Sequence, residues 1–434
     1  MYRNRRLSCR AKLKPRLVAA PLAVAALLSG QAAAESLEQR VQRLEAALAD
    51  SKTAASSATS YRFGGYIKLD AMFSQYSGGE RALASVGDDF LVPSVIPVGG
   101  EPGDAQFDMQ ARHSRIWFKT TSQTAAGSIA THIEMDFGVN QIGDERISNS
   151  SVSRVRHAYV SWQYGEGRSL LAGQSWSTFF NVGSLPETLD FVGPVGTVFE
   201  RQAQLRWTLD LAAGSSLMVA VENPSSGLYG GDSGALGASD FDNNTLPDMV
   251  LRYNGRAGDL SYSLAGLLRE IAYKETFTNA LAQPVAGDDS ELGYGLSISG
   301  KWQLGQDDLK FQLNAGHLGR YLGLQGFRDG YIGAGGDIDL LDTVGGFVAY
   351  RHFWAPKWRS SLVLSASAAD QPSNAAVGTA SAYRSAHANL LYSPVAALTL
   401  GAEWIHAEKR IKGRINGDDS GELDRLQLSV KYVF

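Results

Sequence analysis

Residues 422–434 read ELDRLQLSVKYVF, and this stretch decides the fold. Apolar and polar side chains alternate along it one by one. The apolar series is Leu426, Leu428, Val430, Tyr432 and Phe434, and the polar series is Arg425, Gln427, Ser429 and Lys431. Successive side chains of a β-strand point to opposite faces, so the pattern predicts a strand with one apolar and one polar face. In a soluble sandwich the apolar face fills a core, whereas in an outer-membrane barrel it faces lipid and the polar face lines the lumen.

The same alternation recurs along the chain, most clearly in residues 61–73 and 128–137. Sixteen strands are expected in all. Their ranges are 61–73, 107–120, 128–137, 154–163, 169–175, 201–209, 216–222, 248–255, 259–270, 291–303, 308–320, 343–354, 359–367, 383–392, 397–407 and 422–434.

The connections between these strands alternate strictly in length. Every second connection is short, and the others are long and rich in Gly, Asp, Ser and Pro. Outer-membrane barrels have this rhythm because short turns face the periplasm and long loops face outward. A sandwich has no reason to alternate in this way. The pattern therefore predicts an all-β fold, a 16-stranded antiparallel transmembrane β-barrel occupying residues 61–434.

Aromatic residues support a membrane location. Six of them fall within a few residues of a predicted short turn: Trp162, Trp207, Trp302, Trp354, Trp358 and Tyr392. Amphipathic rings are favoured at the membrane–water interface, so this clustering predicts one aromatic belt at the periplasmic side. The overall composition is compatible, with 44% hydrophobic and 19% charged residues. No stretch after residue 34 offers the roughly 20 apolar residues that a spanning helix needs.

The N-terminus reads as an export signal. Residues 1–16 hold seven basic residues and no acid, residues 17–28 are apolar, and Ala32, Ala33 and Ala34 form a small-residue cleavage site. We therefore expect residues 1–34 to be a signal peptide. Its removal leaves 33 basic against 44 acidic residues, a net charge of about −11, so nucleic acid is not expected as a partner. The single cysteine, Cys9, lies within this segment.

A short helical segment is expected before the barrel. Residues 35–50 read ESLEQRVQRLEAALAD, and apolar residues recur at spacings of 4, 3 and 4 at Leu37, Val41, Leu44 and Leu48. This is the seam of an α-helical coiled coil. Two heptads are too few to associate alone, so we expect a periplasmic coiled coil between copies that are already held together, or in contact with the cell wall. A single amphipathic helix lying on its own barrel is the alternative. Residues 51–60 are a linker of small residues.

Several segments resemble the DcaP-like porins. They are FGGYIKLDA at 63–71, VPSVIPVGG at 92–100, ARHSR at 111–115, EMDF at 134–137, RHAYV at 156–160, AGQSWSTF at 172–179 and LPETLDF at 185–191. The clear resemblance covers residues 61–224, and beyond them only the spacing and the last strand match. It implies a trimeric sixteen-stranded porin of the Gram-negative outer membrane, with an N-terminal coiled coil, that favours small anionic solutes such as dicarboxylates.

The long connection at 176–200 is the third outer loop in this count, and in porins of this size that loop folds into the lumen. Here it carries Glu187 and Asp190, together with proline and glycine residues that can fix a turn. We expect it to form the constriction of the pore. An ordinary surface loop is the alternative.

Opposite such a loop, basic side chains are expected to line the pore, because guanidinium groups facing carboxylates create a strong transverse field. Arginine also binds carboxylates in a bidentate fork. The candidates are Lys68, Arg115, Arg154, Arg156, Arg201 and Arg206, with Arg62 beside them. Strand parity places Arg115 and Arg206 inward and leaves the facing of Arg156 open. Arg112 has the outward parity unless a bulge intervenes.

Motifs for other functions are missing from the sequence. The seven histidines lack paired metal-ligand spacing, and Asp232, Asp240 and Asp242 do not follow an EF-hand pattern, so neither a metal nor another cofactor is expected. No GxSxG or GxxxxGK[ST] motif occurs. The prediction is a diffusion porin rather than an enzyme. Its rivals are a porin for phosphate or sugars, an outer-membrane enzyme, and a non-conducting structural or adhesin barrel.

Overall fold

The computed structural model describes residues 41–42, 45, 59–81, 86–138, 143–144, 148, 150–230, 238–278, 283–322, 326–333 and 335–434. The chain divides into two compact units, Met1–Ala58 and Thr59–Phe434. In the first unit Val41, Gln42 and Glu45 are described, and all three are helical. The rest of the predicted coiled coil, including Leu37, Leu44 and Leu48, and the predicted signal peptide lie outside the described residues. No helix within the described ranges is long and apolar enough to cross a membrane.

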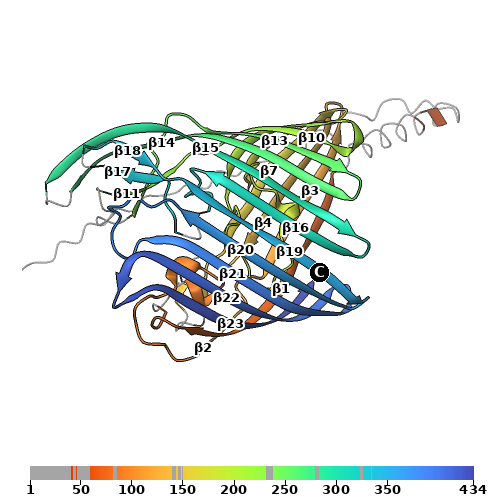
Figure 1. The fold of residues 1–434 in the computed structure, drawn as a ribbon. Helices are drawn as coiled ribbons and strands as arrows, with labels where there is room; N and C mark the ends of the chain where they lie inside the picture. The colour runs from red at the N-terminus through yellow and green to blue at the C-terminus, as the bar shows by residue number, and fades with distance from the viewer. Residues whose placement is uncertain are drawn as a thin grey trace, which may run out of the picture. The chain divides into compact units, whose positions relative to one another are not determined.

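The second unit is a closed antiparallel barrel (Figure 1). Sixteen strands form its wall in the described part of the chain, if β2 and β3 are counted as the two halves of one strand that pairs with β1. Their bounds are β1 (Ser60–Tyr76), β2 (Gln106–Gln110), β3 (Arg115–Thr124), β4 (Gly127–Asp136), β7 (Arg154–Gly165), β8 (Arg168–Trp176), β9 (Arg201–Asp210), β10 (Ser216–Glu222), β13 (Asp248–Ala257), β14 (Leu260–Thr278), β15 (Pro284–Leu304), β16 (Asp307–Gly316), β19 (Thr343–Ala355), β20 (Trp358–Ala369), β21 (Ala380–Val395), β22 (Leu398–Ile415) and β23 (Asp418–Val433).

Pairing between the first and last strands closes the barrel, with Ile67 of β1 opposite Tyr432 of β23. The predicted all-β fold of sixteen antiparallel strands is thereby confirmed. The main differences lie at the long-loop ends. β14 and β15 run on well past the predicted 259–270 and 291–303, because their hairpin continues its hydrogen-bond ladder where the sequence no longer alternates.

The wall has the two faces that the alternation predicts. In β23, Leu426, Leu428 and Val430 are exposed on the outside, whereas Arg425 and Gln427 are buried on the inside. Aromatic residues gather near the short turns: the indole of Trp162 donates to the carbonyl of Ala126, and the ring of Trp358 stacks on Tyr392 at 4.5 Å. This outer surface of large apolar side chains is suited to lipid, with an aromatic rim at its short-turn end.

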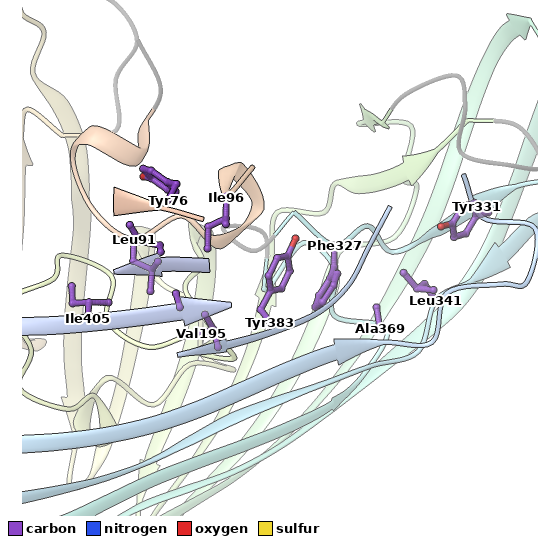
Figure 2. Close-up of a cluster of buried hydrophobic side chains, with 12 residues drawn as sticks. Tyr76, Leu91, Ile96, Val195, Phe327, Tyr331, Leu341, Ala369, Tyr383 and Ile405 are labelled. Atoms are coloured by element: carbon purple, nitrogen blue, oxygen red, sulfur yellow. The ribbon is translucent and has the colours of Figure 1, made fainter. Parts of the chain in front are cut away.

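The long-loop half of the lumen is partly filled by a hydrophobic cluster (Figure 2). It joins side chains from the first outer loop (residues 77–105), the loop after β8 and the loop after β16 to the inner face of the wall. Its buried members are Tyr76, Leu91, Ile96, Val195, Phe327, Tyr331, Leu341, Ala369, Tyr383, Ile405, Ala407 and Leu423. Leu91 and Ile96 show that the described part of the first outer loop folds inward, which alternation cannot predict because the segment has no regular period.

Two outer loops form a small sheet of their own at the long-loop end. It contains β12 (Ala238–Phe241), β11 (Ser226–Tyr229), β17 (Gly330–Ile332) and β18 (Ile338–Leu340), in that order, while β5 (Gly143–Asp144) and β6 (Ser150–Ser151) form a separate hairpin. Arg269 of β14 fixes the four-stranded sheet to the barrel. Its buried guanidinium contacts the carboxylate of Asp329 at 2.6 Å and donates to the carbonyl of Ser225 at 2.6 Å.

Candidate functional site: the lumen loop and the arginine wall

Residues 177–200, which we call the lumen loop, cross the inside of the barrel. The loop begins after β8 and contains the single turn η3 (Val182–Ser184). Hydrogen bonds attach it to the inner wall at successive points: Asn181 to Ser299 of β15, Leu185 to Lys310 of β16, Leu189 to Glu403 of β22, and Val195 to Ser385 of β21. The loop is thus held against the half of the wall that runs from β15 to β22.

Glu187 is clamped by two arginines of that wall. Arg359 Nε and Nη2 donate to its carboxylate at 2.9 and 2.6 Å, and Arg351 Nη1 donates at 3.0 Å. Burial alone would raise the pKa of Glu187, but its hydrogen bonds and charge interactions with Arg359 and Arg351 hold that pKa below its usual value. The carboxylate is therefore neutralised on its own side of the pore.

Leu189 and Asp190 fix the middle of the lumen loop through hydrogen bonds. The Asp190 carboxylate accepts hydrogen bonds from the backbone amides of Leu91, Val192 and Gly193, at 2.7 to 3.0 Å. Lys68 Nζ donates to the carbonyl of Leu189 at 2.7 Å and also contacts Asp70. The structure thus places Lys68 as an anchor beneath the loop and Asp190 as an internal turn residue.

The return path of the loop needs glycine at position 196. Gly196 has a φ of +75°, and a Cβ there would lie 2.3 Å from the backbone nitrogen of Gly346 in β19. Asn314 of β16 donates to the Gly196 carbonyl at 2.9 Å. Loop and wall are in backbone contact here, which fixes the position of the loop along the wall.

The opposite side of the lumen carries a connected set of arginines and acids, which we call the arginine wall: Arg115 of β3, Glu134 and Asp136 of β4, Arg154 and Arg156 of β7, and Arg201 of β9. Arg154 binds Asp136 through two hydrogen bonds, at 2.6 and 3.2 Å. Arg156 bridges the two acids, with Nε 2.8 Å from Glu134 and Nη1 2.7 Å from Asp136.

A β-bulge explains why strand parity could not settle the facing of Arg156. In β4, Glu134 pairs with His157 and the next residue, Met135, pairs with Val155, so β7 has one extra residue at this point. Both Arg156 and His157 are therefore turned inward and buried. Bulges often re-aim side chains near functional sites.

Arg115 and Arg201 complete the arginine wall. Arg115 Nη1 lies 3.3 Å from Glu134, so two guanidinium groups share that carboxylate. Arg201 forms no ion pair with any described carboxylate, and its guanidinium lies 4.6 Å from the ring centre of Trp176. Its Nη1 is buried and has no hydrogen-bond partner among the residues that the structure describes. Four arginines thus stand against two acids, an excess of two positive charges.

Arg206 lies on the inner face of β9, closer to the short turns. It makes no ion pair within the described residues. Another arginine, Arg252, lies on the same inner face two strands away, on β13. It donates to the carbonyl of Phe180 at 2.8 Å, and sequence reasoning did not select it. Positive charge therefore continues from the arginine wall toward the short-turn rim.

Phe191 brings the lumen loop to the arginine wall. Its ring stacks on His113 at 4.3 Å and lies 5.8 and 5.3 Å from the guanidinium groups of Arg154 and Arg156. Aromatic rings accept cations on their faces, so this contact stabilises the arginines without cancelling their charge. The loop and the wall together bound the narrow part of the lumen.

Glu200, the last residue of the lumen loop, has a long ion pair with Arg320 and no hydrogen bond to a basic side chain in the described part of the chain. Burial raises its pKa to about 7, while Arg320, Arg201 and Arg269 act in the opposite direction. The nearest of these, Arg320, lies 3.9 Å away. Glu200 therefore changes charge near neutral pH beside the unpaired Arg201.

Ser385, His387 and Glu403 are joined in the order that serine hydrolases use. Ser385 Oγ is 3.1 Å from His387 Nε2, and His387 Nδ1 is 3.1 Å from Glu403. All three side chains are nevertheless buried, and Ser385 Oγ accepts the amide hydrogen of Val195 while Glu403 accepts that of Leu189. The set anchors the lumen loop and offers no substrate access to the serine.

Sequence reasoning missed the residues that hold the loop. Arg351, Arg359 and Glu403 lie on the inner face of strands whose alternation was read correctly, so their inward facing could have been deduced. Their partners could not, because they lie far away in the sequence. No group of three or more His, Cys, Asp or Glu that could hold a metal ion is found among the described residues.

Comparisons with known proteins agree with this architecture. The family model described as DcaP outer membrane protein matches residues 34–434. The outer membrane channel DcaP of Acinetobacter baumannii has a similar fold, with a TM-score of 0.68 at 20% identity over 87% of this chain and 98% of that chain. No curated protein matches the sequence.

Two further solved structures share the fold at lower similarity. The trimer form of OmpT, an outer membrane protein of Vibrio cholerae, has a TM-score of 0.55 at 12% identity, covering 87% of this chain and 100% of that chain. The anion-selective porin from Comamonas acidovorans has a TM-score of 0.54 at 9% identity, with the same coverage. At these identities the likeness concerns the fold alone.

Proposed function

Because the chain belongs to the DcaP outer membrane protein family, we propose that it is a diffusion porin that passes small hydrophilic solutes and favours small anions such as dicarboxylates. The proposal is for a channel and not for an enzyme. The outer membrane is its location, and the short turns face the periplasm in this assignment.

The observation that carries the anion preference is the charge of the arginine wall. Four guanidinium groups face two carboxylates there, and Arg201 has a buried N–H without a partner. The charge of Arg201 is thus not cancelled by a described carboxylate and can attract an anion in the pore. On the other side of the pore, Glu187 is neutralised by Arg351 and Arg359 and contributes little opposing field.

The arginine wall is suited to release a permeating anion as well as to bind it. Arg115, Arg154 and Arg201 are only partly buried and reach the lumen, whereas Arg156 is nearly covered and orients the two acids. Diffusive conduction requires sites that attract the solute but hold it weakly. Partial neutralisation by Glu134 and Asp136 moderates the attraction in this way.

The experiment is a single-channel recording of the purified protein in a planar bilayer under a salt gradient. An anion-selective reversal potential supports the proposal, and a current reduced by added succinate supports dicarboxylate entry. Reduction by phosphate alone, or by a sugar alone, would favour the corresponding rival porin. Folded protein without any conductance would favour the structural or adhesin barrel.

We further propose that the protein is a homotrimer whose N-terminal segment, residues 35–50, forms a periplasmic coiled coil after removal of residues 1–34. The repeat of Leu37, Val41, Leu44 and Leu48 supports this. The trimer form of the Vibrio cholerae protein with the same fold supports it as well. Contact of this segment with the cell wall stays part of the proposal.

A further inference from the structure

The outer face of the barrel carries a groove of about 620 Å³ across β16, β19, β20 and β21. Its floor consists of residues with little or no side chain: Gly346, Ala366, Ala368 and Ala382. Branched side chains that are about half exposed flank it: Leu313, Val344, Val348 and Leu364. Ligand pockets of proteins fall in this range of volumes.

The groove opens toward lipid and not toward the lumen. The residues that alternate with its floor point inward, and Phe347 and Val363 pack together there, both buried. Gly346 leaves the floor without a side chain at this point. A larger residue would not fit here, because its Cβ would lie 2.2 Å from the carbonyl oxygen of Gln312. The groove is therefore a feature of the membrane-facing surface, where lipid is the surrounding solvent.

Arg384 stands at the β21 edge of the groove, two residues closer to the short turn than Ala382 on the same strand. It is directly opposite Ala366, which is in turn opposite Gly346. Ala366 lies eight residues beyond Trp358 of the aromatic rim, which corresponds to roughly 20 Å of height for a strand tilted by about 40°. The apolar band of such barrels is about 25 Å tall, so the long Arg384 side chain reaches the headgroup level of the outer leaflet.

Positive charge is in excess where Arg384 meets the groove. Arg384 Nη1 lies 3.8 Å from Glu408, and Arg410 Nε lies 2.6 Å from the same carboxylate. Both guanidinium groups remain more than half exposed, at 62% and 52%. The next acid, Glu422, faces Glu408 from β23, about 10 Å farther from the groove than Arg384 at the usual spacing of strands.

We propose that this groove binds a phosphate-bearing lipid of the outer leaflet, with an acyl chain along the floor of small residues and the phosphate against Arg384. The small side chains and their branched neighbours form an apolar groove that suits an acyl chain. Arg384 provides donors for an anionic oxygen at the height where the headgroup lies. Neither feature alone selects this ligand, since the groove accepts any acyl chain and the arginine accepts any anion.

The test is native mass spectrometry of the full-length protein in a neutral detergent, with bisphosphorylated lipid A as the probe and a phosphate-free analogue beside it. Ala366→Leu fills the floor, and Arg384→Gln removes the charge. Ala203→Leu, on the exposed outer face of β9, and Arg168→Gln, at the short-turn end of β8, are the matched controls. Unchanged single-channel conductance of each variant verifies folding.

Arg384→Gln is expected to reduce the fraction of protein carrying lipid A several-fold and to leave the phosphate-free analogue unaffected. Ala366→Leu is expected to reduce both, and the controls neither. Equal lipid A retention in all four variants would overturn the proposal. So would a change of oligomer mass in Ala366→Leu without lipid loss, which would assign the groove to a second copy of the chain. Neither result touches the solute preference of the pore.

Discussion

Arg359 of β20 grips both carboxylate oxygens of Glu187, with Nη2 2.6 Å from Oε1 and Nε 2.9 Å from Oε2. The two residues are 172 positions apart, and this contact holds the lumen loop to the wall. It also neutralises the charge of Glu187, so this carboxylate adds little to the field opposite the arginine wall. Both effects are open to experiment.

Glu187→Gln is expected to loosen the lumen loop, because Arg351 and Arg359 lose their shared anion. The expected result is a larger and noisier single-channel current and a loss of about 1–3 kcal/mol of unfolding free energy, less than for a fully buried pair because the site is partly exposed. Urea titration measures the stability. Glu101→Gln, an exposed acid of the first outer loop, is the control. A current trace identical to the wild type would contradict the clamp.

The same contact between Glu187 and the two arginines predicts the pH below which the lumen loop loosens. The pKa of Glu187 is held below its usual value of 4.5. A depressed carboxyl contributes stability that is present above the unfolded pKa and is lost as pH falls through the folded pKa. Current noise is therefore expected to stay constant down to about pH 4.5 and to rise below it. Glu187→Gln should be noisy at every pH, and pH-independent noise in the wild type would count against the model.

Arg201→Gln is expected to weaken anion selectivity. One charge about 10 Å from a permeating ion in water contributes about 0.4 kcal/mol, roughly a twofold effect. Since it attracts anions and repels cations, the permeability ratio should fall about fourfold. Reversal potentials under a salt gradient measure this ratio. Arg414→Gln, exposed near the turn of the β22–β23 hairpin, serves as the matched control and should leave the ratio unchanged.

Glu200 is expected to make the anion selectivity of the pore depend on pH near neutrality. Burial raises its pKa to about 7, so the group is neutral at pH 6 and charged at pH 8 beside Arg201. Anion selectivity should therefore decrease as pH rises from 6 to 8, and Glu200→Gln should abolish the decrease. The stability that the protonated form contributes is complete below the usual pKa of 4.5 and is lost as pH rises through about 7. A selectivity independent of pH in the wild type would refute this role.

Ser385→Ala separates the anchoring role from hydrolysis. The buried hydroxyl accepts from Val195 and contacts His387, so its loss should cost about 1–3 kcal/mol of stability. Conductance should change little. A fluorophosphonate probe should not label the folded wild-type protein, because Ser385 is covered by the loop. Labelling that Ser385→Ala prevents would revive the hydrolase alternative.

The barrel could be predicted from the sequence because lipid imposes one rule on every strand. Leu426 and Leu428 must face outward and Gln427 inward, and this rule repeats sixteen times. The ends of the strands were harder to predict from the sequence, as the long β14–β15 hairpin shows. In β14 beyond Glu270, Ile271 and Tyr273 are buried against Leu228 of the small loop sheet, so lipid does not impose alternation there.

The site was predictable only in its residue types. Arg115 and Arg206 face inward by parity, but the bulge at Arg156 depends on the register between β4 and β7. Contacts such as Glu187 with Arg359 join distant segments and leave no local trace in the sequence. Sequence reasoning therefore found the charges but not which of them are neutralised.

The most direct test of the whole account is the reversal potential of single channels in a planar bilayer under a tenfold potassium chloride gradient. A potential that shows chloride to be more permeant than potassium is the predicted result, since the arginine wall carries two more positive than negative charges while Glu187 is neutralised. A cation-selective potential from stable channels would contradict the account, because it would mean that the acids of the lumen, and not its arginines, control the narrow part of the pore.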